Sequence, residues 1–190
     1  MKTVFIFGLG YVGVPLAQAL ADQGWQIRGT TRTPSKLANK VNQGWQILPF
    51  QAGQPLADPA AAFADIDAII STITAIGGSD PVLDAHGDDL ANFSGWSGYV
   101  SATSVYPDMP HDICYEDTAV APATARGKAR VVAEARWQQN FGTEIFRAAG
   151  IYGVGRSPFD ALRDGTARII EREGQVFNRI HVDDICRIII

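Results

Sequence analysis

The sequence has little of what several classes of protein require. Its 190 residues include only two cysteines, Cys114 and Cys186, far apart and without metal-ligand spacing. We therefore expect buried, unreactive thiols rather than a disulfide or a metal site. No run of basic residues is present, and the formal net charge of −4 gives no electrostatic reason to expect nucleic acid or an anionic membrane as a partner. No apolar stretch has the length of a transmembrane helix.

The amino-terminal segment also lacks the uninterrupted apolar core of a secretory signal. Met1 and Lys2 precede apolar residues, but three glycines and Pro15 interrupt them. A strand, a turn and a helix explain this segment better, so we expect a cytoplasmic protein.

The remaining composition is that of a soluble globular domain of ordinary size, with 46% hydrophobic and 19% charged residues. The three histidines, His86, His111 and His181, are scattered, and none pairs with cysteine or an acid at metal-ligand spacing. We predict that the protein has no metal site.

The most informative motif is a G-x-G-x-x-G turn that directly follows an apolar strand at residues 3–7 and precedes an amphipathic helix. In that context the first glycine permits a sharp turn, the second lets a pyrophosphate approach the backbone, and the third lets the helix pack closely on the strand. The helix amino terminus adds free N–H groups and partial positive charge. The turn therefore predicts a dinucleotide site formed by Gly8, Leu9, Gly10, Tyr11, Val12 and Gly13.

The end of the second predicted strand indicates which dinucleotide is preferred. NAD-binding proteins place an acid about twenty residues beyond the glycine turn, whereas an arginine accommodates the 2′-phosphate of NADP. Here Thr31 and Arg32 stand at that place without a carboxylate, and Lys36 follows. We predict NADP rather than NAD; the alternative is that Arg32 and Lys36 are solvated surface charges.

Strands alternate with helices along residues 1–150. Strands are expected at residues 3–7, 25–30, 45–50, 66–72, 97–102 and 144–148. Helices are expected after the glycine turn as far as Gly24, and at residues 34–41, 59–63, 81–93 and 124–140. Such alternation requires crossovers and favours an α/β fold, a Rossmann-type doubly wound parallel sheet with helices on both faces. We add Ser71 and Thr72, which end the fourth strand, to the predicted cofactor site.

Residues 151–190 leave this pattern and read as loops with a short helix. We interpret them as the incomplete start of a small C-terminal substrate subdomain, after an NAD(P)-binding domain at residues 1–150. A helix beginning near residue 182 is interrupted at Ile190 without a cap, so we expect a fragment of a longer protein.

Four segments together resemble the extended short-chain dehydrogenase/reductases, the NAD-dependent epimerase/dehydratase family that acts on nucleoside-diphosphate sugars. They are residues 8–13, 100–106, 146–153 and 177–184. The resemblance implies a small-molecule substrate, a nucleotide sugar being one candidate. It also implies a chain that continues beyond this length. Members of the family often pair through helices on the outer face of the sheet, so a homodimer is one candidate state.

The chain departs from this family at the catalytic pair, a Tyr and a Lys on the helix after the fifth strand. Alignment of that helix places Arg126 at the tyrosine position and Arg130 at the lysine position. An arginine does not release its proton near neutral pH, so it does not replace the phenol as an acid or base. Ala102 falls where the family has a Ser or Thr, although Ser101, Thr103 and Ser104 are close enough to substitute if the register shifts by one.

Two functions remain open at this stage. The first is an NADP-dependent enzyme with rearranged acid–base groups, for which Thr103, Ser104 and Tyr106 are candidates. Arg126 and Arg130 would then bind an anionic group. In the structural alternative, Tyr106 packs behind the fifth strand and the two arginines form a solvated helix face. The second function is a non-catalytic module that senses NADP(H).

Overall fold

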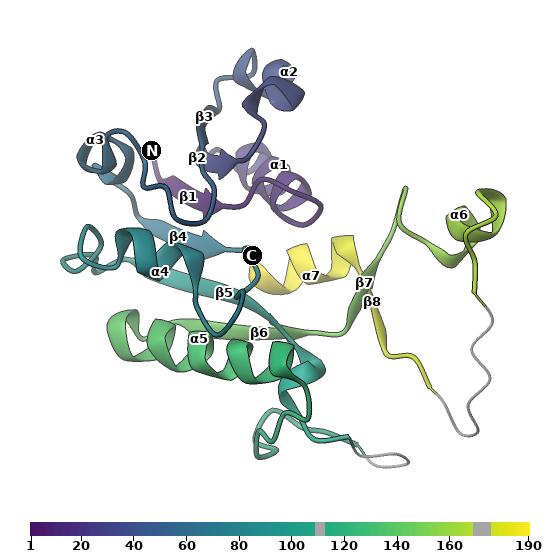
Figure 1. Cartoon of the computed structure of the whole chain (residues 1–190). Helices are drawn as coiled ribbons and strands as arrows, with labels where there is room; N and C mark the ends of the chain where they lie inside the picture. Colours follow the sequence, from purple (N-terminus) through teal and green to yellow (C-terminus); the bar gives the residue numbers. More distant parts are fainter. Residues whose placement is uncertain (109–112, 169–175) are drawn as a thin grey trace.

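The computed structural model describes residues 1–108, 113–168 and 176–190 (Figure 1). The strands are β1 (Thr3–Phe7), β2 (Gln26–Thr31), β3 (Gln46–Pro49), β4 (Ala68–Ser71), β5 (Trp96–Ala102), β6 (Glu144–Ala148), β7 (Gly150–Tyr152) and β8 (Arg179–His181). The α-helices are α1 (Gly13–Asp22), α2 (Ala38–Val41), α3 (Pro59–Phe63), α4 (Pro81–His86), α5 (Ala125–Phe141), α6 (Pro158–Arg163) and α7 (Val182–Ile189). Two 3₁₀ helices are η1 (Pro34–Leu37) and η2 (Thr103–Val105).

Six strands form one parallel sheet in the order β3-β2-β1-β4-β5-β6. This order confirms the predicted doubly wound Rossmann-type fold. The strand order reverses between β1 and β4, where Phe7 lies beside Ser71 in register. In open parallel sheets ligands bind outside the carboxyl ends of the strands at such a reversal.

The two faces of the sheet carry separate cores, as expected when successive strand residues point to opposite sides. Val4 and Ile6 of β1 pack with α1 and α7 on one face. Phe5 and Phe7 pack with α3, α4 and α5 on the other face. Figure 1 shows these helices on opposite sides of the sheet. The unbroken apolar run of β1 therefore reflects burial on both faces.

Part of the structure differs from the sequence-based expectation. The helix predicted at residues 81–93 ends at His86, because Gly87 and two aspartates follow, and these residues disfavour a helix interior. The side chain of the second aspartate, Asp89, is hydrogen-bonded to His86 Nδ1. For residues 151–190 the sequence predicts loops with one short helix. In the structure, β7 and β8 also pair with each other to form a two-stranded parallel sheet. Figure 1 shows this pair leading away from the main sheet toward α6. The division of the chain into two domains at residue 150 stays a prediction.

The cysteine prediction is partly wrong. Both thiols are free, but only Cys186 is buried, on α7. Burial raises the pKa of the Cys186 thiol to about 11, which keeps it protonated and unreactive. Cys114 is exposed, because it lies in the connection between η2 and α5, outside both cores. In the residues that the structure describes, no helix is long and apolar enough to cross a membrane.

Candidate dinucleotide site

The glycine turn connects β1 to α1 at the point of strand-order reversal. Gly8 has a φ of +95°, which L side chains rarely adopt. Its N–H donates to Thr30 Oγ1 over 3.0 Å, and its carbonyl accepts from Thr72 Oγ1 over 2.7 Å. A Cβ at Gly13 would lie 2.1 Å from the Gly8 carbonyl oxygen, so only glycine allows this approach of α1 to the turn.

The surface of this turn offers what an anion needs. A Cβ at Gly10 would meet nothing nearer than the Gly8 carbonyl oxygen at 4.0 Å, so the space above Gly10 is open. The backbone N–H groups of Tyr11 and Val12 donate to no other residue in the described part of the chain. Free amides at a helix amino terminus, beside an open approach, form a phosphate-binding arrangement. The residues present therefore fit a dinucleotide pyrophosphate.

The end of β2 places the predicted specificity residues at the surface. Thr31 is half-buried as the last residue of the strand, while Arg32 and Lys36 are exposed. Lys36 lies on η1, which Pro34 begins. Both cations follow the strand that flanks the glycine turn, and Thr30 of that strand accepts the Gly8 amide.

The end of β4 contributes two hydroxyl side chains with different surroundings. Thr72 is engaged with the Phe7 and Gly8 carbonyl oxygens, so its hydroxyl holds the turn. Ser71 is fully buried, and its Oγ has no hydrogen-bond partner among the described residues. A buried hydroxyl without a partner at the strand-order reversal is a free donor or acceptor beside the turn.

The predicted pair on α5 lies where this helix meets η2. Thr124 caps α5 by accepting from the Gly127 amide. A Cβ on Gly127 would lie 2.3 Å from the Ser104 carbonyl oxygen, so glycine permits the close approach. Arg126 is exposed in the first turn. Arg130 is half-buried and donates from Nη2 to Thr74 Oγ1 over 3.4 Å, just beyond β4.

Arg130 is not fully satisfied by the protein. Its Nε and Nη1 are buried without a hydrogen-bond partner among the described residues. Buried donors without partners are costly, because the protein removes them from water without returning hydrogen bonds. Arg130 therefore retains two donors whose hydrogen-bonding capacity the described residues leave unused, just beyond the carboxyl end of β4.

Tyr106 belongs to a polar network that the sequence did not reveal. Its phenol oxygen accepts from Arg147 Nη1 over 3.2 Å, and the guanidinium also lies 5.1 Å from the ring centre. Arg147 forms a bidentate ion pair with Glu134, whose side chain is 4% exposed and also accepts from Ser101. The Glu134 carboxylate raises the pKa of Arg147, so this cation is permanent. Thr103 and Ser104 lie on η2, and among the described residues no side-chain hydrogen bond connects them to this network.

A second buried polar cluster lies under α4 and α5. The Asp80 carboxylate caps α4 and accepts from Trp137 Nε1 over 3.1 Å. Burial raises the pKa of Asp80, and burial also raises the pKa of Tyr99, which stacks on Trp137. These groups hold α4 and α5 on the sheet, so we assign them to the fold rather than to the site.

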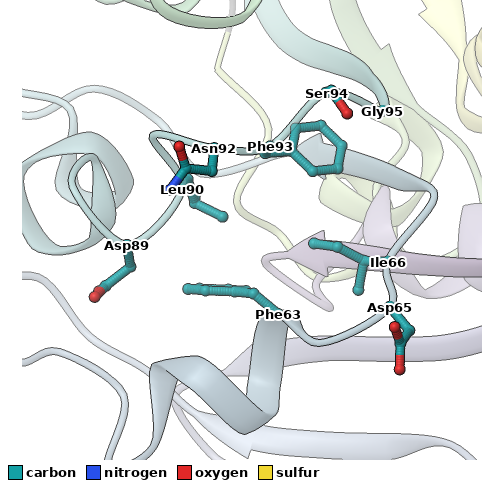
Figure 2. A pocket seen from close by; sticks show the side chains of 9 residues that line it. All are labelled: Phe63, Asp65, Ile66, Asp89, Leu90, Asn92, Phe93, Ser94 and Gly95. Carbon is teal, nitrogen blue, oxygen red and sulfur yellow. The ribbon is translucent and has the colours of Figure 1, made fainter.

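A cavity of about 280 Å³ lies elsewhere (Figure 2). Phe63, Ile66 and Phe93 line it together with Asp65 and Asp89. Because Ile66 and Gly95 precede β4 and β5, the cavity opens at the amino ends of these strands. That is the sheet edge opposite the glycine turn, so the cavity is separate from the dinucleotide site.

Metal-ligating residues do not gather in the described residues, where no three His, Cys, Asp or Glu side chains come together to hold an ion. His86 is buried and bonded to the Leu56 amide and Asp89, and His181 caps α7. His111 lies outside the described residues.

Comparisons with known proteins agree with this architecture. Residues 3–116 match the family described as the NAD binding domain of 6-phosphogluconate dehydrogenase. Protein YeeZ of Escherichia coli (strain K12) is 32% identical over 199 residues, covering 97% of this chain and 70% of YeeZ. The solved structure of a functionally unknown conserved protein from Silicibacter pomeroyi DSS is 39% identical with a TM-score of 0.87. That match covers all of this chain and 67% of the other.

A more distant likeness concerns the fold alone. UDP-glucuronic acid 4-epimerase from Bacillus cereus, solved in complex with UDP-glucuronic acid and NAD, has a TM-score of 0.77 at 18% identity. The match covers 98% of this chain and 71% of that one. The sheet order and glycine turn thus define an NAD(P)-binding Rossmann domain, structurally similar to the NAD-dependent epimerases and dehydratases among the extended short-chain dehydrogenase/reductases. Through residues 3–116 the chain belongs to the family of the NAD binding domain of 6-phosphogluconate dehydrogenase, and it is a YeeZ-like protein.

Proposed function

We propose that this chain binds NADP(H) in preference to NAD(H) and acts on a small-molecule substrate in an epimerase or reductase reaction. The observation that carries the proposal is the glycine turn with its open approach and free amides; the unpartnered donors of Arg130, just beyond β4, support it. The bound nicotinamide would supply or accept the hydride. The protein would hold the phosphates, orient the rings and exclude water.

The preference for NADP(H) rests on Arg32. A carboxylate at the end of β2 would repel a 2′-phosphate, whereas a guanidinium binds one through two parallel hydrogen bonds. Arg32 and Lys36 are both exposed, so neither has to break a buried contact to reach a ligand.

In this proposal Arg126 and Arg130 replace the tyrosine and lysine used by typical members of the family. Both lie in the first two turns of α5, and positions i and i+4 share one helix side. As permanent cations they would bind a substrate phosphate or carboxylate rather than transfer a proton. A nucleotide sugar has such a group, and the B. cereus enzyme was solved with one.

Proton transfer then falls to Tyr106, Thr103 or Ser104. Tyr106 has the most suitable surroundings, because the Arg147 guanidinium donates to its oxygen and that hydrogen bond would persist in a phenolate. If Tyr106 is the acid–base group, Tyr106→Phe should remove turnover while leaving NADPH affinity within about twofold of the wild type.

The second candidate is a non-catalytic NADP(H)-sensing module. The two arginines favour it, because neither transfers a proton near neutral pH. Turnover of any nucleotide sugar, or NADPH oxidation that depends on an added carbonyl compound, would exclude the sensor.

Arg32→Ala should weaken NADPH binding about tenfold, the value of one charge-assisted contact, and change NADH binding less than twofold. Calorimetric titration of both nucleotides with the wild type and the variant measures this. Arg187→Ala is the control, because it removes an exposed charge on α7 that is paired with Asp184. Equal affinities of the wild-type protein for NADPH and NADH would contradict the proposed preference.

A further inference from the structure

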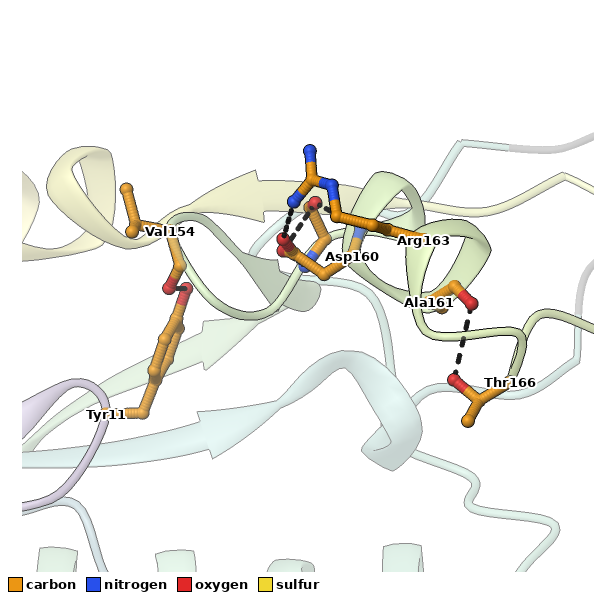
Figure 3. A network of polar contacts seen from close by, with 7 residues as sticks. Tyr11, Val154, Asp160, Ala161, Arg163 and Thr166 are labelled. Carbon is orange, nitrogen blue, oxygen red and sulfur yellow. Dashed lines mark hydrogen bonds and ion pairs between the residues drawn. The ribbon is translucent and has the colours of Figure 1, made fainter.

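Tyr11 of the glycine turn contacts a second turn, far along the chain. Its hydroxyl donates to the Val154 carbonyl oxygen over 3.3 Å (Figure 3). Val154 lies inside a tight turn that Gly153 and Arg156 close with reciprocal backbone hydrogen bonds of 3.3 and 3.0 Å. The phosphate turn and the segment after β7 therefore meet directly.

Gly153 shows how close this approach is. A Cβ at Gly153 would lie 2.8 Å from Tyr11 Oη, 2.9 Å from Val182 Cγ1 and 3.1 Å from His181 Nε2. The absence of a side chain lets the turn sit between the glycine turn and the start of α7. Arg156 follows at a fixed place, because its own N–H and C=O both bond to Gly153.

This placement brings a cation to the phosphate turn. The Arg156 guanidinium carbon lies 5.2 Å from the centre of the Tyr11 ring, a cation–π contact. The ring belongs to one of the two residues whose amides are free. We call residues 153–168, which follow β7 and include α6, the arm. Arg163 of this arm is paired with Asp160 (Figure 3), whereas Arg156 has no carboxylate partner in the described part of the chain.

We propose that Arg156 forms part of a diphosphate-binding site together with the free amides of Tyr11 and Val12. The amides would bind one face of the diphosphate, and the guanidinium would approach it from the arm, held in place by stacking on Tyr11. A planar guanidinium suits phosphate oxygens better than an ammonium does. The inference rests on the proposed function, and the diphosphate belongs either to the dinucleotide or to a nucleoside-diphosphate substrate.

Calorimetric titrations of the 190-residue chain with NADPH, and separately with UDP in the absence of any dinucleotide, test this site. Arg156→Ala should weaken one of these ligands about tenfold at low ionic strength, and less as salt rises. Arg156→Lys should recover part of that loss. Arg163→Ala is the matched control, an exposed arginine of the same arm, and should leave both affinities within twofold.

The two ligands separate the sources of the diphosphate. A loss confined to NADPH assigns Arg156 to the cofactor, and a loss confined to UDP assigns it to the substrate. If Arg156→Ala binds both ligands as the wild type does, the inference is wrong while the proposed function stands. If the wild-type chain binds neither NADPH, NADH nor UDP, both are overturned.

Discussion

Replacing Gly10 with alanine should weaken dinucleotide binding at least tenfold, about 1.4 kcal/mol, while leaving stability almost unchanged. The added methyl group would meet no protein atom closer than 4.0 Å, so the folded chain accommodates it. It would instead occupy the open approach above the free amides of Tyr11 and Val12, where the proposed pyrophosphate comes nearest to the backbone. Calorimetric titration with NADPH, alongside a thermal melt, measures both quantities.

Gly13→Ala is the matched comparison within the same turn. Its methyl group would lie 2.1 Å from the Gly8 carbonyl oxygen, so this variant should lose stability as well as affinity. An alanine at position 10 that binds NADPH as tightly as the wild type would show that the pyrophosphate does not approach this turn. Loss of both stability and binding in both variants would leave steric damage to the turn as the explanation.

Removing the Glu134 side chain should cost about 3 kcal/mol of unfolding free energy, the typical loss when one partner of a buried ion pair is deleted. The Glu134 carboxylate accepts hydrogen bonds from three donor atoms, which are Nε and Nη2 of Arg147 and Oγ of Ser101. Glu134→Ala would leave the Arg147 guanidinium only the Tyr106 oxygen as a partner among these groups. For a chain of this size the melting temperature should fall by roughly 6–12 °C.

Arg163→Ala provides the control for charge removal. Its ion pair with Asp160 is largely exposed on the arginine side, at 76%, so its loss should cost less than about 1 kcal/mol. Denaturant unfolding of the three proteins in one buffer makes the comparison. A Glu134→Ala variant as stable as Arg163→Ala would mean that water replaces the lost contacts of Arg147.

The NADP(H) proposal sets this chain apart from one of its structural neighbours. The B. cereus epimerase with the same fold was solved with NAD. In Rossmann folds the residues that end the second strand contact the adenosine ribose, so a shared fold is compatible with either dinucleotide. In our proposal, Arg32 is the residue on which the preference for NADP(H) depends.

Local pattern was enough for the core of the fold. An apolar strand followed by three correctly spaced glycines predicts the β1 turn, because Gly8 adopts a positive φ, Gly13 lies against the Gly8 carbonyl oxygen and Gly10 leaves the approach to the backbone open. In the structure, Asp58 and Thr124 each accept a backbone amide at the start of a helix, α3 and α5 respectively. The exceptions were α4, which ends at His86, and the pairing of β7 with β8. A three-residue strand is too short to show a clear two-residue periodicity, so the sequence does not predict which distant strand it pairs with.

The α/β alternation, the glycine turn and the end of β2 without a carboxylate can be predicted from the amino-acid sequence, because they follow from periodicity, turn chemistry and charge within a short span. Three features become visible in the folded chain alone: the buried pair of Glu134 and Arg147 beside Tyr106, the two unpartnered donors of Arg130, and the contact of Arg156 with the Tyr11 ring. The sequence does not show which residues form hydrogen bonds or ion pairs with a charged side chain. Its role depends on which side chains the fold brings within hydrogen-bond distance and which it removes from water.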